Sequence, residues 1–419
     1  MDCDDHDAEA QPGRNSSDAL ADTNCNGISG MMPNRSVVTE KSWEHELCAG
    51  TAPRGVVVLG DSASGALPLV LLLLLLLPLM LLLLVLLPLV LPFVLLTSSS
   101  IAAHFHIPPA LLSPANWSLA ALGGLIRVTD EFDLPQCSTA TGFANYSTSG
   151  ESGNATNDAC PPTKFTRSEL KGGGSIYQRL LRRNGCNFND FQNIAVNGAR
   201  AGAMAGNIVE GMSRFANRSK PLLVILALIG DDVCNGHAGT ASMTTPDAFR
   251  ASTNKTLAYL DTVLPRGSHV LIVGLADGRL LYDIMHTERH PIGTPYPAFY
   301  DYLNCLEVNP CWGWLNSNGT ARNETSARAR QLNLVYSGLP TSIIERQTSG
   351  AQVYKNFRML YTEPNLAANV QEYMDNGILG DGRQRKDCVE PSDGFHPSQT
   401  LQVKKTDHTS MDPCCELLM

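Results

Sequence analysis

One stretch decides the fold: Val56-Val57-Val58-Leu59-Gly60-Asp61-Ser62-Ala63. An uninterrupted run of valine and leucine is typical of a strand that is buried on both faces of a sheet. Where such a strand stops at a tight glycine turn, the next small polar side chain lies exposed at the sheet edge. Ser62 is therefore placed to attack a substrate, provided that a base can reach it.

A second motif, Asp393-Gly394-Phe395-His396-Pro397, lies near the other end of the chain. An aspartate three residues before a histidine, in a loop flanked by glycine and proline, can supply a base and the carboxylate that orients it. We expect Ser62 to be the nucleophile, His396 the base and Asp393 the orienting group. The two motifs together resemble the pattern of GDSL (SGNH) esterases.

Short apolar runs alternate with amphipathic stretches along the chain, which indicates a parallel sheet covered by helices on both faces. The expected strands are residues 55–59, 191–196, 221–229, 269–274 and 356–361. The expected helices are residues 200–214, 246–263, 324–347 and 366–377. Residues 137–175 are rich in serine, glycine and asparagine, so we expect them to form a surface insertion.

Several blocks resemble one branch of that family, the acyloxyacyl hydrolases, which remove secondary acyl chains from bacterial lipopolysaccharide. They are residues 184–187, 192–199, 229–234 and 390–397, and they follow the family's order. The resemblance covers about residues 1–400 outside an apolar run. It implies an SGNH-hydrolase (flavodoxin-like) three-layer α/β/α fold with a parallel sheet, preceded by an Asp-rich calcium-binding segment.

The resemblance also implies an oxyanion hole made of the backbone N–H of Ser62, the N–H of Gly198 and an asparagine side chain. The asparagine position is occupied by Asp231 in this chain. An ionised carboxylate repels an oxyanion, and the loss of one donor costs about 10²–10³ in rate. A protonated Asp231 could still donate a hydrogen bond.

Residues 66–96 are almost wholly leucine, valine and proline. Their length suits a transmembrane helix, but Pro78 and Pro88 interrupt it, and a span would separate Ser62 from His396. Excising residues 64–101 joins Ala63 to Ala102 and restores the family pattern. We interpret the segment as a retained intron, because a translated polypyrimidine tract reads as leucine and proline. A membrane segment and an insertion of another purpose are the alternatives.

Residues 1–30 form an acidic loop that is rich in asparagine. Closely spaced carboxylates repel one another unless a cation neutralises them, and Ca²⁺ prefers oxygen ligands from flexible loops. The resemblance implies a structural Ca²⁺ here and no organic cofactor; the alternative is a solvated acidic leader. The expected ligands are Asp2, Asp4, Asp5, Asp7, Asp22, Asn24 and Asn26.

The composition points to the secretory route and away from nucleic acid. The net charge is −9, and no basic cluster interrupts it. The chain carries 12 cysteines and nine N-x-S/T sequons, which is typical of a disulfide-bonded glycoprotein. The close pairs that could form bridges are Cys3–Cys25, Cys137–Cys160 and Cys305–Cys311. The chain opens on acidic residues and no signal peptide begins it, so we expect an upstream segment to be missing.

Three regions follow from these patterns: a calcium-binding segment (1–45), a GDSL/SGNH hydrolase domain (46–403) and an atypical tail (404–419). The resemblance implies a secreted or endolysosomal serine esterase that acts on lipopolysaccharide-like glycolipids or phospholipids, in contact with a membrane surface. It also implies a saposin-like domain upstream, which this chain lacks. A generic GDSL phospholipid or carbohydrate esterase and a catalytically impaired lipid-binding glycoprotein are the alternatives.

Overall fold

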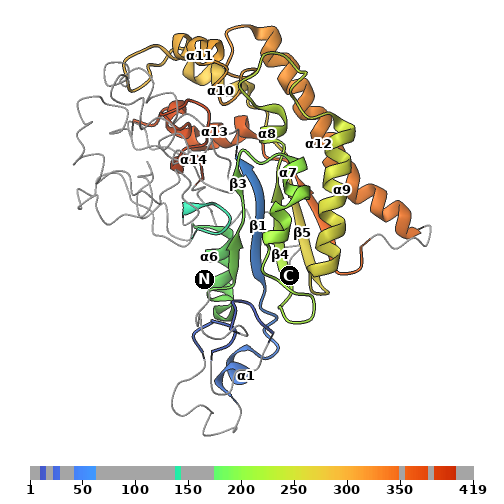
Figure 1. Cartoon of the computed structure of the whole chain (residues 1–419). Coiled ribbons are helices and arrows are strands. Elements are labelled where there is room, and N and C mark those ends of the chain that lie inside the picture. Colours follow the sequence, from blue (N-terminus) through green and yellow to red (C-terminus); the bar gives the residue numbers. More distant parts are fainter. Residues whose placement is uncertain are drawn as a thin grey trace, which may run out of the picture.

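A parallel β-sheet forms the centre of the molecule in the computed structural model, which describes residues 10–15, 22–28, 42–62, 137–142, 174–348, 354–375 and 382–402. The strand order is β2-β1-β4-β5-β6, and β3 also pairs with β1 (Figure 1). The strands are β1 (Gly55–Ser62), β2 (Phe191–Asn193), β3 (Val196–Asn197), β4 (Leu222–Ala227), β5 (Ser268–Val273) and β6 (Phe357–Thr362). Every pairing is parallel, as the alternation of strands and helices predicts.

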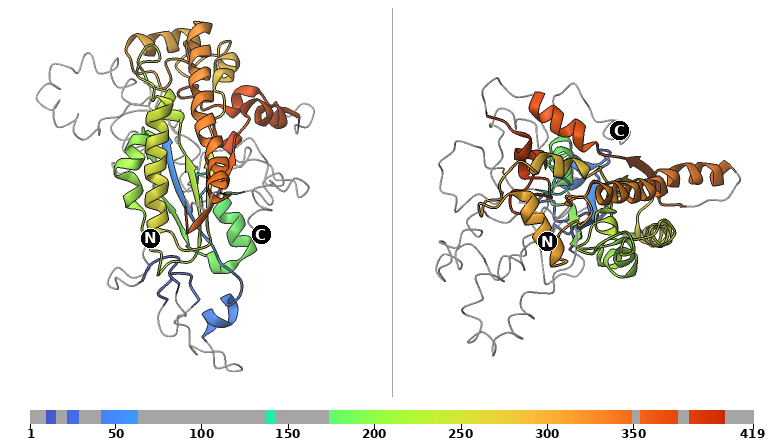
Figure 2. Two further views of the ribbon diagram at one scale, coloured as in Figure 1. Left: turned by 90° about the vertical axis from the view of Figure 1, so that its right-hand side faces the viewer. Right: turned by 90° about the horizontal axis from the view of Figure 1, so that it is seen from above.

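The apolar run 56–59 is buried because β1 lies inside the sheet, between β2 and β4. Val57 and Leu59 point into the larger core cluster, with residues of α7 (Ala201–Gly206), α9 (Pro246–Val263) and α12 (Gly319–Thr348). Val56 and Val58 pack with Tyr177 of α6 (Ile176–Arg183) on the other face. Figure 2 shows the helices on the two sides of the strands. Both faces of the sheet are therefore covered, which confirms the three-layer α/β/α arrangement.

Helices α6 and α9 begin where the sequence supplies capping groups. Ser175 forms a capping box with Gln178 at α6, and the Thr245 hydroxyl accepts from the N–H of Ala248 at α9, which has Pro246 in its first turn. The described helices are α1 (Trp43–Cys48), α6 (Ile176–Arg183), α7 (Ala201–Gly206), α8 (Gly230–Val233), α9 (Pro246–Val263), α10 (Arg279–Met285), α11 (Tyr296–Cys305), α12 (Gly319–Thr348), α13 (Leu366–Asp375) and α14 (Gln399–Gln402). The described 3₁₀ turns are η4 (Gly185–Asn187), η5 (Ile208–Gly211) and η6 (Arg385–Cys388).

Residues 137–142 differ from the expected surface insertion. Cys137, Ser138 and Thr141 are fully buried, and Ala140 joins the core cluster of α6. Backbone N–H groups of Ile176 and Tyr177 donate to the carbonyls of Thr139 and Ala140, so this segment braces the start of α6. The serine-rich composition misled the prediction here, because small side chains also suit a tightly packed turn.

Two disulfides connect described residues that lie far apart in the sequence. Cys48 of α1 pairs with Cys186 of η4, and Cys234 pairs with Cys311. The predicted Cys305–Cys311 bridge is therefore wrong: Cys305 is an exposed free thiol. Cys25 and Cys137 are disulfide-bonded, but Cys3 and Cys160 lie outside the described residues, so those two pairings stay predictions.

Within the described part of the chain, no helix is both long and apolar enough to cross a membrane. The apolar run 66–96 lies outside that part.

Candidate active site

The carboxyl end of β1 lies at the point where the strand order of the sheet reverses. From β1 the chain passes to β2 and β3 on one side, and then to β4 on the other. Ser62 is the last residue of β1, and its backbone is paired with Asn197 of β3. In open α/β sheets such a switch point forms a crevice that binds ligands. The topology thus brings Ser62, the turn after β3 and the turn after β4 to one edge, although the Ser62 side chain is outside the described part.

Asp393 and His396 form a buried pair. The Nδ1 atom of His396 donates to Oδ2 of Asp393 at 2.5 Å, and the two side chains are 2 % and 0 % exposed. The other carboxylate oxygen, Oδ1, accepts from the N–H groups of Phe395 (2.7 Å) and His396 (3.1 Å). The carboxylate is thereby fixed on both oxygens, and it holds the imidazole in the tautomer that carries its proton on Nδ1.

The loop that carries this pair is closed by its own backbone. The N–H of Glu390 donates to the carbonyl of His396 at 2.7 Å, and the N–H of Gly394 donates to the carbonyl of Glu390 at 2.9 Å. Gly394 has φ of +65°, a left-handed conformation that glycine adopts without steric cost. The sequence Asp-Gly-Phe-His-Pro thus makes a tight turn, which points the Asp393 side chain back at His396. Figure 1 places α14, which follows the loop, near the end of the sheet at which β1 and β3 finish.

Gly198, the expected oxyanion donor, directly follows β3 and has φ of +81°. The turn continues into α7, whose first N–H, on Ala201, donates to Oδ2 of Asp232 at 3.1 Å. Asp232 comes from α8, so its buried carboxylate ties the turn after β3 to the turn after β4. Burial raises the pKa of this carboxyl, while hydrogen bonds from Thr244 and Ala201 lower it. Asp232 is not among the site residues predicted from the sequence, although two adjacent carboxylates after an apolar strand were a signal that could have identified it.

Asp231, the expected asparagine position, lies in α8 and is 1 % exposed. The residue before this short helix, Ile229, has φ of +107°, a conformation that costs energy for a β-branched side chain. Helix α8 contacts β1. The structure therefore places Asp231 in a constrained turn beside the strand that ends in Ser62.

A second histidine, His290, is buried beside the Asp393 loop. Its Nε2 atom donates to the carbonyl of Ser392 at 2.8 Å, and its Nδ1 atom accepts from the N–H of Ile292 at 3.3 Å. This pattern needs the neutral ring. Burial lowers the pKa of His290 below its ordinary value, although the Ser392 carbonyl and the Asp393 charge oppose that shift.

His290 should make the protein less stable in mild acid. In the unfolded chain the pKa of His290 is near 6.5, and in the folded chain it is lower. As the pH drops through 6.5, the unfolded chain therefore binds the proton first, and the free energy of unfolding falls. Urea unfolding at pH 7.5 and pH 5.5 should show a smaller loss of stability in His290→Gln than in the wild type, because glutamine does not bind a proton in this range. Equal losses in the two proteins would show that His290 does not contribute.

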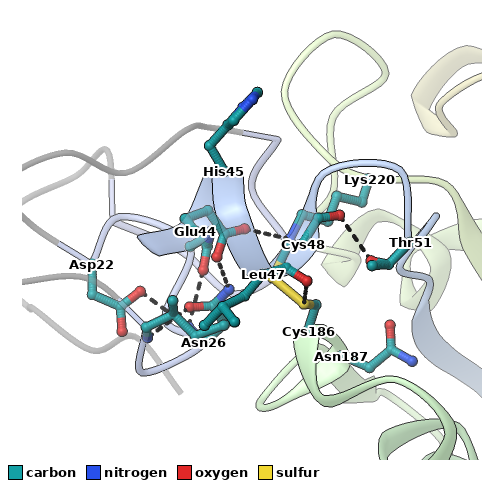
Figure 3. Close-up of polar contacts among 12 residues, drawn as sticks. Asp22, Asn26, Glu44, His45, Leu47, Cys48, Thr51, Cys186, Asn187 and Lys220 are labelled. Atoms are coloured by element: carbon teal, nitrogen blue, oxygen red, sulfur yellow. Dashed lines mark hydrogen bonds and ion pairs between the residues drawn. A yellow bond between two sulfur atoms is a disulfide. The ribbon is translucent and has the colours of Figure 1, made fainter. Parts of the chain in front are cut away.

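Part of the expected calcium segment is described, and Figure 3 shows it beside α1. Asp22 accepts from the N–H groups of Asn26 (3.0 Å) and Gly27 (2.7 Å), and both asparagine amides, of Asn24 and Asn26, donate to the buried Glu44 carboxylate. Asp2, Asp4, Asp5 and Asp7 lie outside the described residues. Across the described ranges, no three His, Cys, Asp or Glu side chains gather closely enough to hold a metal.

A cavity of about 570 Å³ opens next to this segment, lined among others by Glu44, Arg54 and Lys220. It lies at the amino end of β1, and Ser62 lies at the carboxyl end. The opposite ends of an eight-residue strand are too far apart to share one site. This cavity is therefore separate from the Asp393–His396 pair.

Comparison with known proteins shows similarity to enzymes that hydrolyse acyl esters. The model of the "GDSL-like Lipase/Acylhydrolase" family matches residues 118–404, which include Gly198, Asp231, Asp393 and His396 but not Ser62. Acyloxyacyl hydrolase from Mus musculus is 34% identical over 411 residues, which cover 96% of this chain and 58% of that protein. The Homo sapiens protein of the same name is 34% identical over 416 residues, with 97% and 59% covered. The chain thus spans somewhat more than half the length of these relatives.

Proposed function

Because this chain belongs to the GDSL-like lipase/acylhydrolase family, we propose that it hydrolyses acyl ester bonds with Ser62, His396 and Asp393. The observation that carries the proposal is the buried hydrogen bond of 2.5 Å between His396 Nδ1 and Asp393 Oδ2. A buried carboxylate that fixes the tautomer of a histidine is what a serine nucleophile needs from its base.

The reaction follows from the tautomer. With its proton on Nδ1, His396 accepts the hydroxyl proton of Ser62 on Nε2 while the Ser62 oxygen attacks the ester carbonyl carbon. The N–H groups of Ser62 and Gly198 stabilise the oxyanion, and Asp393 stabilises the imidazolium. His396 then gives the proton to the leaving alkoxide, which leaves an acyl group on Ser62. A water molecule, deprotonated by His396, releases the fatty acid and restores the serine.

The proposed substrates are the secondary (acyloxyacyl) chains of lipopolysaccharide lipid A, with phospholipids as further substrates. The support is the 34% identity to acyloxyacyl hydrolases over most of the chain. Incubating the purified protein with lipid A and with a diacyl phospholipid, and measuring fatty acids released by mass spectrometry, tests this. Selective loss of the secondary chains from lipid A is expected. Release from phospholipid alone would favour a generic GDSL esterase.

One observation favours a second candidate function, that of a catalytically impaired lipid-binding glycoprotein. The carboxylate of Asp231 replaces an amide donor at a buried position. Lipid binding in a flotation assay without fatty acid release from any ester would support this alternative.

We place the protein in the secretory route, either secreted or endolysosomal. The described sequon asparagines, Asn15, Asn217, Asn254, Asn318 and Asn323, are all exposed and could each accept a glycan. The described disulfides agree with an oxidising compartment. Contact with a membrane surface and an upstream saposin-like domain belong to the same proposal.

Calcium is proposed as a structural ion of the 1–45 segment. Asp22, Asn24 and Asn26 place one carboxylate and two amide groups at alternate positions of one turn, next to the buried Glu44 carboxylate. This donor set suits a hard cation, which would neutralise the acidic segment and close it on the domain.

Chelation should therefore lower the melting temperature, because an ion that binds only the folded state stabilises it by mass action. Scanning calorimetry with calcium and with a chelator should show the difference in the wild type and in the Asp283→Asn control, whose carboxylate is exposed on α10. The difference should vanish in Asp22→Asn and in the Asp4→Asn/Asp7→Asn double variant. Identical melting with and without calcium in the wild type would leave a solvated acidic leader.

A further inference from the structure

The loop that carries Asp393 is held from outside by three side chains of one short segment, residues 290–300. The Tyr296 hydroxyl donates to the carbonyl of Pro391 at 2.7 Å, and the Tyr300 hydroxyl donates to the carbonyl of Gly394 at 2.9 Å. With the bond from His290 Nε2 to the carbonyl of Ser392 at 2.8 Å, three of the four carbonyls from 391 to 394 are taken.

These donors have little freedom to move. Their exposed fractions are 2 % for His290, 1 % for Tyr296 and 0 % for Tyr300. The His290 ring stacks on Phe299 at 4.1 Å between centroids, and the rings of Tyr296 and Tyr300 lie 5.5 Å apart. A donor whose rotamer is locked by packing holds its acceptor in one position. The hydrogen bond also forms without the entropy cost of ordering a free side chain.

We call His290, Tyr296 and Tyr300 the clamp. The two tyrosines can lie this close to the Asp393 loop only because residue 394 is a glycine. A Cβ atom at this position would collide with the Tyr300 hydroxyl and the Tyr296 ring. The loop carbonyls therefore face the clamp, whereas the N–H groups of Phe395 and His396 face the Asp393 carboxylate. The clamp thus binds the carbonyl groups of the loop, and the Asp393 carboxylate binds its N–H groups.

We propose that His290, Tyr296 and Tyr300 are positioning residues that set the Asp393 carboxylate against His396 by holding the carbonyls of Pro391, Ser392 and Gly394. This inference rests on the proposed function, and it adds a second layer to the site. Burial raises the pKa values of both tyrosines, so their hydroxyls keep the protons that they donate.

The test removes the donors one at a time. Tyr300→Phe and Tyr296→Phe each delete one hydroxyl, His290→Phe keeps a ring without a donor, and His290→Gln keeps an N–H donor near the Nε2 position. Tyr177→Phe is the matched control, since its buried hydroxyl accepts from the backbone N–H of Asn189 on the other face of the sheet. The measurements are kcat and KM on a soluble short-chain ester, the melting temperature, and the far-downfield proton resonance of the His396 Nδ1–H.

We expect kcat to fall about tenfold in Tyr300→Phe and in His290→Phe, with KM unchanged. The Tyr296→Phe/Tyr300→Phe double variant should lose about 100-fold in kcat, because a catalytic group that is misplaced by about 1 Å can cost that factor. The downfield resonance should weaken in the same variants, and His290→Gln should recover most of the activity lost in His290→Phe. Tyr177→Phe should change only the melting temperature.

The proposal is overturned if folded Tyr300→Phe and His290→Phe keep kcat and the downfield resonance of the wild type, or if Tyr177→Phe loses as much kcat as they do. Failure of the proposed function would look different: turnover by Ser62→Ala would move the nucleophile elsewhere. If the wild type has no turnover, the resonance in each variant still decides whether the clamp sets the Asp393–His396 bond.

Discussion

Replacing Ser62 with alanine should remove nearly all ester hydrolysis, and His396→Ala should have the same effect. Loss of either group in a serine hydrolase costs on the order of 10⁶ in kcat, and the double variant is no worse because the groups act as a unit. Asp393→Asn should cost about 10⁴, because an amide in place of the carboxylate favours the wrong tautomer of His396. Initial rates on a soluble ester, measured on protein that melts like the wild type, give these numbers.

The control for these variants is His237→Ala, which removes an exposed imidazole paired with Glu307 and should leave kcat within about twofold. Retained turnover in Ser62→Ala would assign the nucleophile to another residue and would end the proposed mechanism.

Replacing Asp231 with asparagine should raise activity at neutral pH by about 10²-fold. The amide offers N–H donors without a negative charge, and one oxyanion donor is worth about 10²–10³ in rate. Asp231→Ala separates the two effects: it removes the charge without adding a donor, so its gain should be smaller.

Asp232→Asn is the matched comparison, because it makes the same change one residue further along. The Asp232 carboxylate accepts from the N–H of Ala201, so this variant should lose activity rather than gain it. Unchanged or lower activity in Asp231→Asn would show that the carboxylate at position 231 is tolerated or useful.

The sheet could be predicted from the sequence because its strands are buried on both faces and therefore read as continuous apolar runs. The runs 56–59 and 222–226 are such strands, and the predicted helix 246–263 has the observed bounds of α9, since Thr245 and Pro246 mark its start. The predicted helix 200–214 is broken in the structure into α7 and η5, at Asn207.

Helices α6, α10 and α11 are absent from the elements expected from the sequence, although α6 and α11 carry a helical signal. The buried side chains of α11 lie at positions 296, 299, 300 and 303, which is the i, i+3, i+4, i+7 spacing of an amphipathic helix. Four of the eight residues of α6 are apolar and pack on the smaller core cluster. Cys234 and Cys311 lie 77 residues apart, and they pair because the fold brings their two loops together. No local sequence pattern predicts such a pairing.

The candidate site could be predicted only where it is local in sequence. Asp393 and His396 lie three residues apart, so one motif contained both the residues and their turn. The clamp of His290, Tyr296 and Tyr300 binds carbonyls about 100 positions away, and carbonyls carry no sequence signature. Such positioning contacts become visible only when the backbone is placed in space.

Activation of the Ser62 nucleophile by His396 can be tested by reaction with a fluorophosphonate probe, which phosphonylates an activated serine. The probe should be applied to the full chain, to the chain without residues 64–101, and to the His396→Ala variant of each, with the labelled peptide identified by mass spectrometry. We expect a phosphonylated Ser62 in at least one of the first two proteins and no label in the matching His396→Ala variant. If Ser62 stays unlabelled in both folded forms, it is not an activated nucleophile, and the impaired lipid-binding glycoprotein is favoured.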